Sequence, residues 1–259
     1  MLFFAGISLR AQDREIGVMA GGMYYLGELN QKQFGNVKPA IGLSYRTTYQ
    51  KRISWEQHLL VGTLNGADSL QSDPVMKNRN LSFRNRVAEV GTQLEINYFD
   101  YKMGSKRNFA TPYLFFGFSL FYSNPEAQYQ GKWYALRDIG TEGQKLGTGQ
   151  KYNLINFAVP LGIGFKVSIG TRISLAVFSG FRKTFTDHLD DVGGSYADVS
   201  QFKPEDQVFV DRSLRKQRPD GTNTGLDRGN SNTKDWYNFT GISLHIKTNR
   251  KLSACDRVN

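Results

Sequence analysis

Eight segments of β-type sequence are joined by connections of alternating length, and this rhythm constrains the fold more than any other feature of the chain. The segments are residues 16–26, 40–49, 53–64, 84–99, 111–122, 153–168, 173–187 and 236–247. Segments two and three are joined by residues 50–52 and segments six and seven by residues 169–172, which are hairpin-sized. Residues 65–83, 123–152 and 188–235 are much longer than the connections of compact soluble domains. The alternation therefore predicts an antiparallel sheet with its long loops at one end.

Side chains alternate in polarity along two of these segments, as expected where residues two apart share one face of a strand. In residues 153–168 one row is apolar and the other is small or polar; the apolar row is Phe157, Val159, Leu161, Ile163, Phe165 and Val167, and the other is Ala158, Pro160, Gly162, Gly164 and Lys166. In residues 84–99 the two rows are Val90, Leu94, Ile96 and Tyr98 against Glu89, Gly91, Gln93, Glu95 and Asn97. Residues 111–122 are apolar on both rows, so their facing is ambiguous.

An apolar row needs lipid and a polar row needs a lumen, so the pattern predicts a transmembrane barrel. The predicted fold is all-β, an eight-stranded antiparallel outer-membrane β-barrel with short periplasmic turns and long extracellular loops. The mean hydropathy of −0.46, without a run of 18 apolar residues, argues against a helical membrane protein. Aromatic residues near the strand ends suggest interfacial girdles; they are Tyr49, Trp55 and Phe99 on the short-turn side and Tyr24, Tyr25, Tyr122, Phe185 and Trp236 on the other.

The interior of an eight-stranded barrel is narrow and should be filled with side chains. Seven charged or titratable side chains are assigned to this lumen, where acid–base pairing would offset their burial and fix the register: Arg46, Glu56, His58, Glu89, Glu95, Arg182 and His245.

The chain divides into three parts. Residues 1–11 read as a truncated signal peptide, since residues 2–9 are apolar and Ala11 stands at a plausible cleavage position. Residues 15–247 form the barrel domain, in which residues 188–235 are a long extracellular loop and residues 201–234 are expected to be mobile. Residues 248–259 form a periplasmic C-terminal tail, so both termini are expected in the periplasm. Its Cys255, the single cysteine, suggests an intermolecular disulfide or an incidental thiol.

The formal net charge of +10 leaves nucleic acid, anionic lipid and an acidic partner open. Basic residues collect on the predicted periplasmic side, where they could dock an acidic partner or be solvated turn charge: Lys51, Arg52, Lys102, Lys106, Arg107, Arg172, Lys247, Arg250 and Lys251. Nucleic acid is not indicated, because basic and aromatic residues are not interleaved in one segment.

One acidic cluster could suggest hydrolysis or cation binding. Asp187, Asp190 and Asp191 lie beside His188, but their spacing matches no calcium-binding loop, and Arg182 and Lys183 offer simple charge pairing. No catalytic residue, metal ligand, cofactor or small-molecule substrate is predicted. Two alternatives stay open, an outer-membrane hydrolase with loop residues near Asp187 and His188, and a small-ligand-binding β-barrel.

Four stretches resemble the PorG-like outer-membrane barrels of the type IX secretion system of Bacteroidetes-type bacteria. They are residues 21–29 (GGMYYLGEL), 79–83 (RNLSF), 129–144 (YQGKWYALRDIGTEGQ) and 181–192 (FRKTFTDHLDDV). The resemblance implies a non-enzymatic barrel subunit of the protein secretion machinery. It further implies association with the periplasmic ring formed by the lipoprotein PorK and by PorN, which the barrel would help to anchor to the outer membrane.

Overall fold

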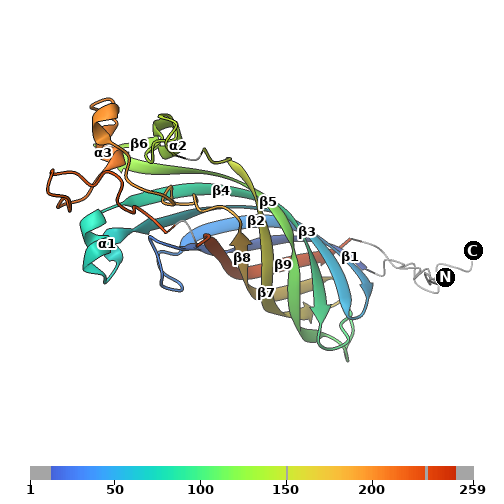
Figure 1. Cartoon of the computed structure of the whole chain (residues 1–259). Helices are drawn as coiled ribbons and strands as arrows, with labels where there is room; N and C mark the ends of the chain where they lie inside the picture. The colour runs from blue at the N-terminus through green and yellow to red at the C-terminus, as the bar shows by residue number, and fades with distance from the viewer. Residues whose placement is uncertain (1–12, 150, 231–232, 249–259) are drawn as a thin grey trace, which may run out of the picture.

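The structure, a computed structural model, describes residues 13–149, 151–230 and 233–248. The expected signal peptide, Arg250, Lys251 and Cys255 lie outside these residues. In the described part, antiparallel strands pair in the order β4-β3-β2-β1-β9-β8-β7-β5, and β4 also pairs with β5, which closes the sheet into a barrel (Figure 1). The barrel strands are β1 (Asp13–Leu26), β2 (Lys38–Gln50), β3 (Ile53–Ala67), β4 (Ser82–Asn97), β5 (Ala110–Tyr129), β7 (Ile155–Ile169), β8 (Ile173–Thr184) and β9 (Trp236–Lys247). The predicted eight-stranded all-β barrel is confirmed.

The connections divide between the two ends of the barrel. At the short-turn end lie residues 51–52, 98–109 and 170–172, together with the described chain ends at Asp13 and Thr248. The long-loop end carries residues 27–37, 68–81, 185–230 and 233–235. It also carries the hairpin of β5 with β6 (Lys132–Ala135), which is followed by residues 136–149 and 151–154. The helical turns also lie at the long-loop end; they are η1 (Asp68–Leu70), α1 (Pro74–Arg79), α2 (Leu136–Ile139), η2 (Val199–Gln201) and α3 (Gln207–Val210).

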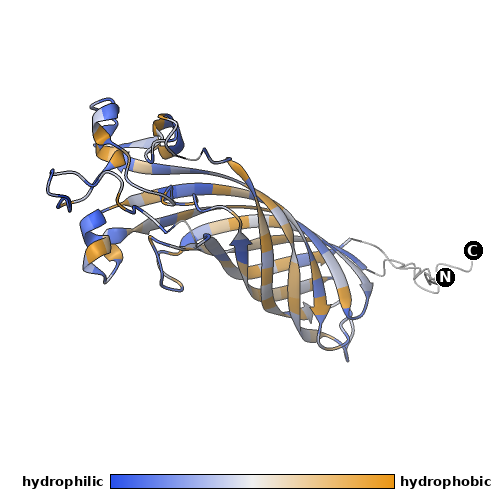
Figure 2. Cartoon of the chain, in the orientation of Figure 1, coloured by the Kyte–Doolittle hydropathy of each residue, from blue (hydrophilic) through white to orange (hydrophobic). Residues whose placement is uncertain are grey.

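Exposed large hydrophobic side chains lie on every strand of the barrel and form an apolar belt on its outside. Figure 2 shows hydrophobic residues recurring along the barrel strands. On β7 the row from Phe157 to Val167 faces outward and Lys166 faces inward, as the alternation predicts. The structure also settles β5, where Leu114, Phe116, Phe118, Leu120 and Tyr122 are exposed while Tyr113, Phe115 and Phe121 are buried. From Leu114 to Tyr122 this row runs about 27 Å along the strand, close to the thickness of a bilayer's hydrocarbon core.

Both margins of the belt carry charge. Arg14 faces outward at the short-turn end of β1, and Arg86 and Lys183 face outward towards the long-loop end of β4 and β8. Among the described residues, none of the helices is long and apolar enough to cross a membrane.

The apolar core is continuous from the barrel into the long-loop end. Met19, Leu60, Phe121 and Phe239 from the strands pack in one cluster with side chains of the connecting loops, namely Leu29, Leu81, Leu189 and Val192. One expectation is wrong here. Tyr24 and Tyr25 are fully buried beneath the loops and belong to no interfacial girdle, because the loops fold over the end of β1. Within residues 201–234, which were expected to form a mobile loop, Phe209 of α3 packs against Ala127, Leu136 and Ile139.

The hairpin of β5 and β6, which the sequence pattern did not predict, is fastened to the barrel by Arg84 of β4. Its guanidinium bonds Glu126 at 2.6 Å and lies 3.6 Å from the ring centroid of Trp133. The hairpin thus extends the sheet beyond the closed ring and supports the loop layer.

Candidate functional site

An ion-pair network occupies the lumen near the short-turn end. The guanidinium of Arg46 contacts Glu15 at 3.2 Å, Glu56 at 3.0 Å and Glu95 at 3.1 Å, and all four side chains are buried. The ammonium group of Lys166 lies 2.7 Å from the same oxygen of Glu95. His245 adds a contact of 3.4 Å to Glu56 and a hydrogen bond of 2.8 Å to Ser44.

A second network surrounds Glu89 in the lumen, closer to the long-loop end. One of its oxygens is 2.9 Å from Nε2 of His58, and the other accepts a hydrogen bond of 2.8 Å from the hydroxyl of Tyr237. Arg182 lies 3.6 Å from the second oxygen. The cavity between the two networks has a volume of about 10 Å³, which is room for one water molecule. Large side chains and ion pairs therefore fill the lumen at this level.

All seven side chains assigned to the lumen from the sequence lie there, but the sequence reasoning missed Glu15, Lys166 and Tyr237 as members of the networks. The alternation along its strand predicted that Lys166 faces inward, but it did not predict which acid Lys166 pairs with. Glu15 is the third residue of β1 and lies just before the predicted segment of residues 16–26, so the alternation did not assign its facing.

Exposed basic residues gather at the short-turn end. Lys51, Arg52, Lys102, Lys106, Arg107 and Arg172 are all exposed there. Asp100 bridges two of them, lying 3.3 Å from Nζ of Lys51 and 3.0 Å from Nε of Arg52, and these hydrogen bonds, from Arg52 first and then Lys51, lower the pKa of its carboxyl. Lys247 differs from the rest, because its side chain is mostly buried and paired with Asp13. We call the six exposed residues the basic face.

Residues 187–192 (DHLDDV) fold into the mouth of the barrel at the long-loop end. The side chain of Leu189 inserts into the core. Its carbonyl accepts a hydrogen bond of 2.7 Å from the side-chain amide of Asn85, and its N–H donates one of 2.9 Å to Asp235. Asp190 accepts a hydrogen bond of 2.6 Å from the hydroxyl of Tyr25. Burial raises the pKa of Asp190 and Asp235 well above the ordinary value. The segment acts as a plug that closes the barrel at this end.

A second layer above the plug is held by Arg228. Its guanidinium donates 3.0 Å to Glu142 and also contacts the carbonyl of Asp191. The carboxylate of Asp191 accepts from Tyr152 at 2.6 Å and from Thr141. The charge pairing expected from the sequence is therefore wrong in its partners: Arg182 points into the lumen towards Glu89, while Asp191 is matched by Arg228 from the far end of the same loop.

The four stretches that carry the family resemblance meet at this end. Tyr25 of the first and Asp190 of the fourth are hydrogen-bonded, Arg79 of the second donates 2.7 Å to the carbonyl of Arg228, and Glu142 of the third bonds Arg228. Residues of all four stretches thus meet in one loop cap.

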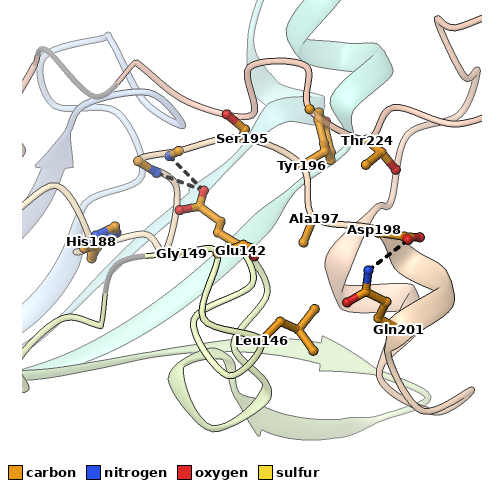
Figure 3. Close-up of a pocket in the computed structure, with 14 residues that line it drawn as sticks. Glu142, Leu146, Gly149, His188, Ser195, Tyr196, Ala197, Asp198, Gln201 and Thr224 are labelled. Atoms are coloured by element: carbon orange, nitrogen blue, oxygen red, sulfur yellow. Dashed lines mark hydrogen bonds between the residues drawn. The ribbon is translucent and has the colours of Figure 1, made fainter.

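A cavity of about 670 Å³ opens between the loops of the cap (Figure 3). Glu142 lies at one side, where one oxygen accepts from the backbone N–H groups of Gly193 and Gly194, both at 3.1 Å. Tyr196, Leu146 and Ala197 give part of the lining an apolar character.

His188 lines the same cavity without the contacts of a catalytic base. Its ring stacks on Tyr152 with 4.5 Å between centroids, and burial lowers its pKa. In the described residues its ring forms no hydrogen bond to a serine, threonine or carboxylate, so no base-activated nucleophile is assembled at this position.

The closed strand ring, the apolar belt and the filled lumen define an outer-membrane type of β-barrel with a folded loop cap. A family model described as "Domain of unknown function (DUF6089)" matches residues 1–256, and the chain belongs to that family. No curated protein matches the chain.

Several solved structures of bacterial surface barrels align with the chain at low identity. Neisserial surface protein A is 8% identical with a TM-score of 0.47, and the alignment covers 92% of this chain and 99% of that one. Ail, the attachment invasion locus protein of Yersinia pestis in complex with the heparin analogue sucrose octasulfate, is 6% identical with a TM-score of 0.43, covering 91% and 98%. The outer membrane protein OprG of Pseudomonas aeruginosa is 8% identical with a TM-score of 0.38, covering 93% and 98%.

Proposed function

We propose that this protein is a non-enzymatic outer-membrane subunit of the type IX protein secretion machinery. In this role the short-turn end faces the periplasm, and the basic face docks the ring formed by PorK and PorN and helps to anchor it to the outer membrane. The resemblance of the loop-cap stretches to PorG-like barrels supports the assignment to this secretion machinery.

The observation that carries an anchoring role is the distribution of charge between the inside and the ends of the barrel. Inside, each of the acids Glu15, Glu56 and Glu95 has Arg46 or Lys166 as a cationic partner. At the short-turn end, by contrast, six basic side chains are exposed around a single bridging acid, Asp100. A filled lumen favours an anchor over a channel, and the surplus positive charge favours an acidic partner.

The basic face also has a shape that a partner could use. Lys51, Arg52 and Arg107 line a hollow of about 600 Å³ together with Phe99 and Asn108. Asp100 bridges Lys51 and Arg52 at this hollow.

Reversal of charge on the basic face tests the proposal. A tagged protein carrying Lys102→Glu, Lys106→Glu and Arg107→Glu would be solubilised from membranes and its co-purifying proteins identified. These three residues have no ion pair in the described part of the chain, so their reversal leaves the barrel's own contacts intact. The matched control is Lys132→Glu with Lys203→Glu, which reverses exposed lysines at the long-loop end.

We expect the wild type and the control to recover PorK and PorN, and the triple variant to lose most of both. Full recovery of the ring with the triple variant would refute docking through the basic face. Recovery of no ring component with the wild type would refute the assignment to the secretion machinery.

A further inference from the structure

Four carboxyl groups meet at the plug, from three separate segments of the chain. Glu28 follows β1, Asp187 and Asp190 follow β8, and Asp235 precedes β9. Glu28, Asp187 and Asp235 each place one oxygen within 4.8 Å of the others. Oxygens that bind one Ca²⁺ at about 2.4 Å can stand at most about 4.8 Å apart, so a single ion could contact all three.

Asp187 provides an independent indication that something is bound. Its side chain is 5% exposed, and its Oδ1 atom has no hydrogen-bond partner in the described residues. The other oxygen lies 3.8 Å from Nζ of Lys234, which is longer than a hydrogen bond. A buried carboxylate oxygen without a partner is costly, and a cation at this position would satisfy it.

The other two carboxylates each have one oxygen fixed by the backbone and one directed to the cluster. Glu28 accepts 3.1 Å from the N–H of Asn230 through Oε1, while its Oε2 lies near Tyr25. Asp235 accepts 2.9 Å from the N–H of Leu189 through Oδ2, while its Oδ1 lies 2.7 Å from the hydroxyl of Tyr25. The backbone contacts orient both groups as ligands are oriented in metal sites.

Among the described residues, the cluster holds more carboxyl groups than cations that could partner them. The hydroxyl of Tyr25 has one hydrogen but lies within hydrogen-bond distance of both Asp190 and Asp235. The positive charge of Lys234 interacts electrostatically with Asp187. Arg79, which is paired with Asp68, interacts electrostatically with Asp190. In the described part of the chain, Lys234 and Arg79 are therefore the two cations that act on these four carboxyl groups.

We propose that Glu28, Asp187 and Asp235 bind one Ca²⁺ ion at the mouth of the barrel. An all-oxygen ligand set suits Ca²⁺ or Mg²⁺, and ligands from three irregular segments suit the flexible coordination of Ca²⁺. The ion ties the ends of β1, β8 and β9 together and fixes the plug. Glu28 and Asp187 are 159 positions apart, and Asp235 lies a further 48 positions along the chain. No local sequence motif therefore indicates the site.

Gly27 shows how closely the chain is fitted to this cluster. A Cβ atom added there would stand 2.0 Å from the hydroxyl oxygen of Tyr25 and 2.4 Å from Oδ1 of Asp235. Any larger residue at this position would displace both groups, so glycine is required beside the site.

Terbium luminescence on the full-length protein in detergent micelles tests the inference. Tb³⁺ replaces Ca²⁺ at oxygen sites, and excitation of the nearby Tyr25 sensitises its emission. Asp187→Asn is the test variant, because it keeps the shape of the side chain and removes its charge. Asp220→Asn, an exposed change in the same loop, is the matched control. A heat-dependent shift in gel mobility shows that each variant is folded.

We expect saturable emission from the wild type that Ca²⁺ displaces, unchanged affinity in the control, and at least tenfold weaker binding in folded Asp187→Asn. Glu28→Gln, in a partly exposed position, should weaken binding in the same way and serves if Asp187→Asn fails to fold. Absence of Ca²⁺-displaceable emission in the wild type, or wild-type affinity in the folded test variant, would overturn the inference. The outcome is independent of ring docking, because the purified barrel alone is measured.

Discussion

The ammonium nitrogen of Lys166 lies 2.7 Å from Oε2 of Glu95, and both side chains are fully buried inside the barrel. The pair joins β7 to β4 across the lumen, with β5 between them in the sheet. Arg46 reaches the same oxygen from β2 at 3.1 Å. One carboxylate therefore links three strands that do not neighbour one another.

Loss of this pair should destabilise the barrel strongly. Lys166→Met leaves Glu95 buried with one cation fewer, and breaking a buried ion pair costs about 3–5 kcal/mol. Urea unfolding in lipid vesicles, followed by tryptophan fluorescence, measures the change. Lys102→Met, which removes an exposed lysine, should unfold as the wild type does. An unchanged midpoint for Lys166→Met would show that the pair does not stabilise the fold.

Glu89 should be equally sensitive, for a different reason. Glu89→Leu removes the acceptor for Tyr237 and His58 and leaves Arg182 buried without its carboxylate. We expect less of the heat-modifiable, folded form on a gel than for Glu205→Leu, which changes an exposed charge. Equal folded fractions for the two variants would contradict the role given to the second network.

The lipid belt can be tested with two equally exposed side chains. Phe118 on β5 is 71% exposed and Leu214 in the loop cap is 70% exposed, but the first lies within the belt and the second outside it. A lysine on the lipid face near the midplane costs roughly 2–4 kcal/mol, so Phe118→Lys should reduce folding into vesicles. Leu214→Lys should fold normally, because water already surrounds that position. Similar folding yields for both would place Phe118 in water.

The loop cap should loosen as the pH rises. Burial raises the pKa of Asp191 to about 6 in the folded protein, against an ordinary value of 3.8. A raised folded-state pKa gives a contribution to stability that is fully present below pH 3.8 and is lost as the pH rises through about 6. Hydrogen exchange of the amides in residues 189–194 should therefore show an opening free energy lower by about 1 kcal/mol at pH 7 than at pH 5.

Asp191→Asn is the control for this pH dependence, since its side chain does not titrate. Its opening free energy should vary less between pH 5 and pH 7 than that of the wild type. If the two proteins change by the same amount, another group causes the effect.

The barrel was predictable because successive side chains of a strand point to opposite faces, so the alternation of polarity shows which residues face lipid and which face the lumen. Phe157 and Lys166 fall on opposite rows in the sequence and on opposite sides of the wall in the structure. The facing of residues 111–122 was not predictable, since an eight-stranded lumen also accepts aromatics such as Phe115 and Phe121. There only the pairing of β5 with β4 and β7 decides which row faces lipid.

The loop cap was much less predictable, because its contacts join residues far apart in the chain. Arg228 pairs with Glu142 across 86 positions, and no periodicity connects them. The mouth cluster shows the same limit: Asp187, Asp190 and Asp191 were visible as neighbours, but Glu28 and Asp235 come from other segments. Composition also did not predict that Phe209, within the polar residues 201–230, packs against Ala127 of β5 and Leu136 of α2.

The account depends on a closed strand ring whose outer belt lies in lipid, and vesicle flotation tests this most directly. The full-length protein, refolded with lipid vesicles and washed with alkaline carbonate, should float with the lipid. It should also give the circular dichroism spectrum of a β-protein. A monomer that stays in solution without detergent or lipid, or a largely helical spectrum, would contradict the account.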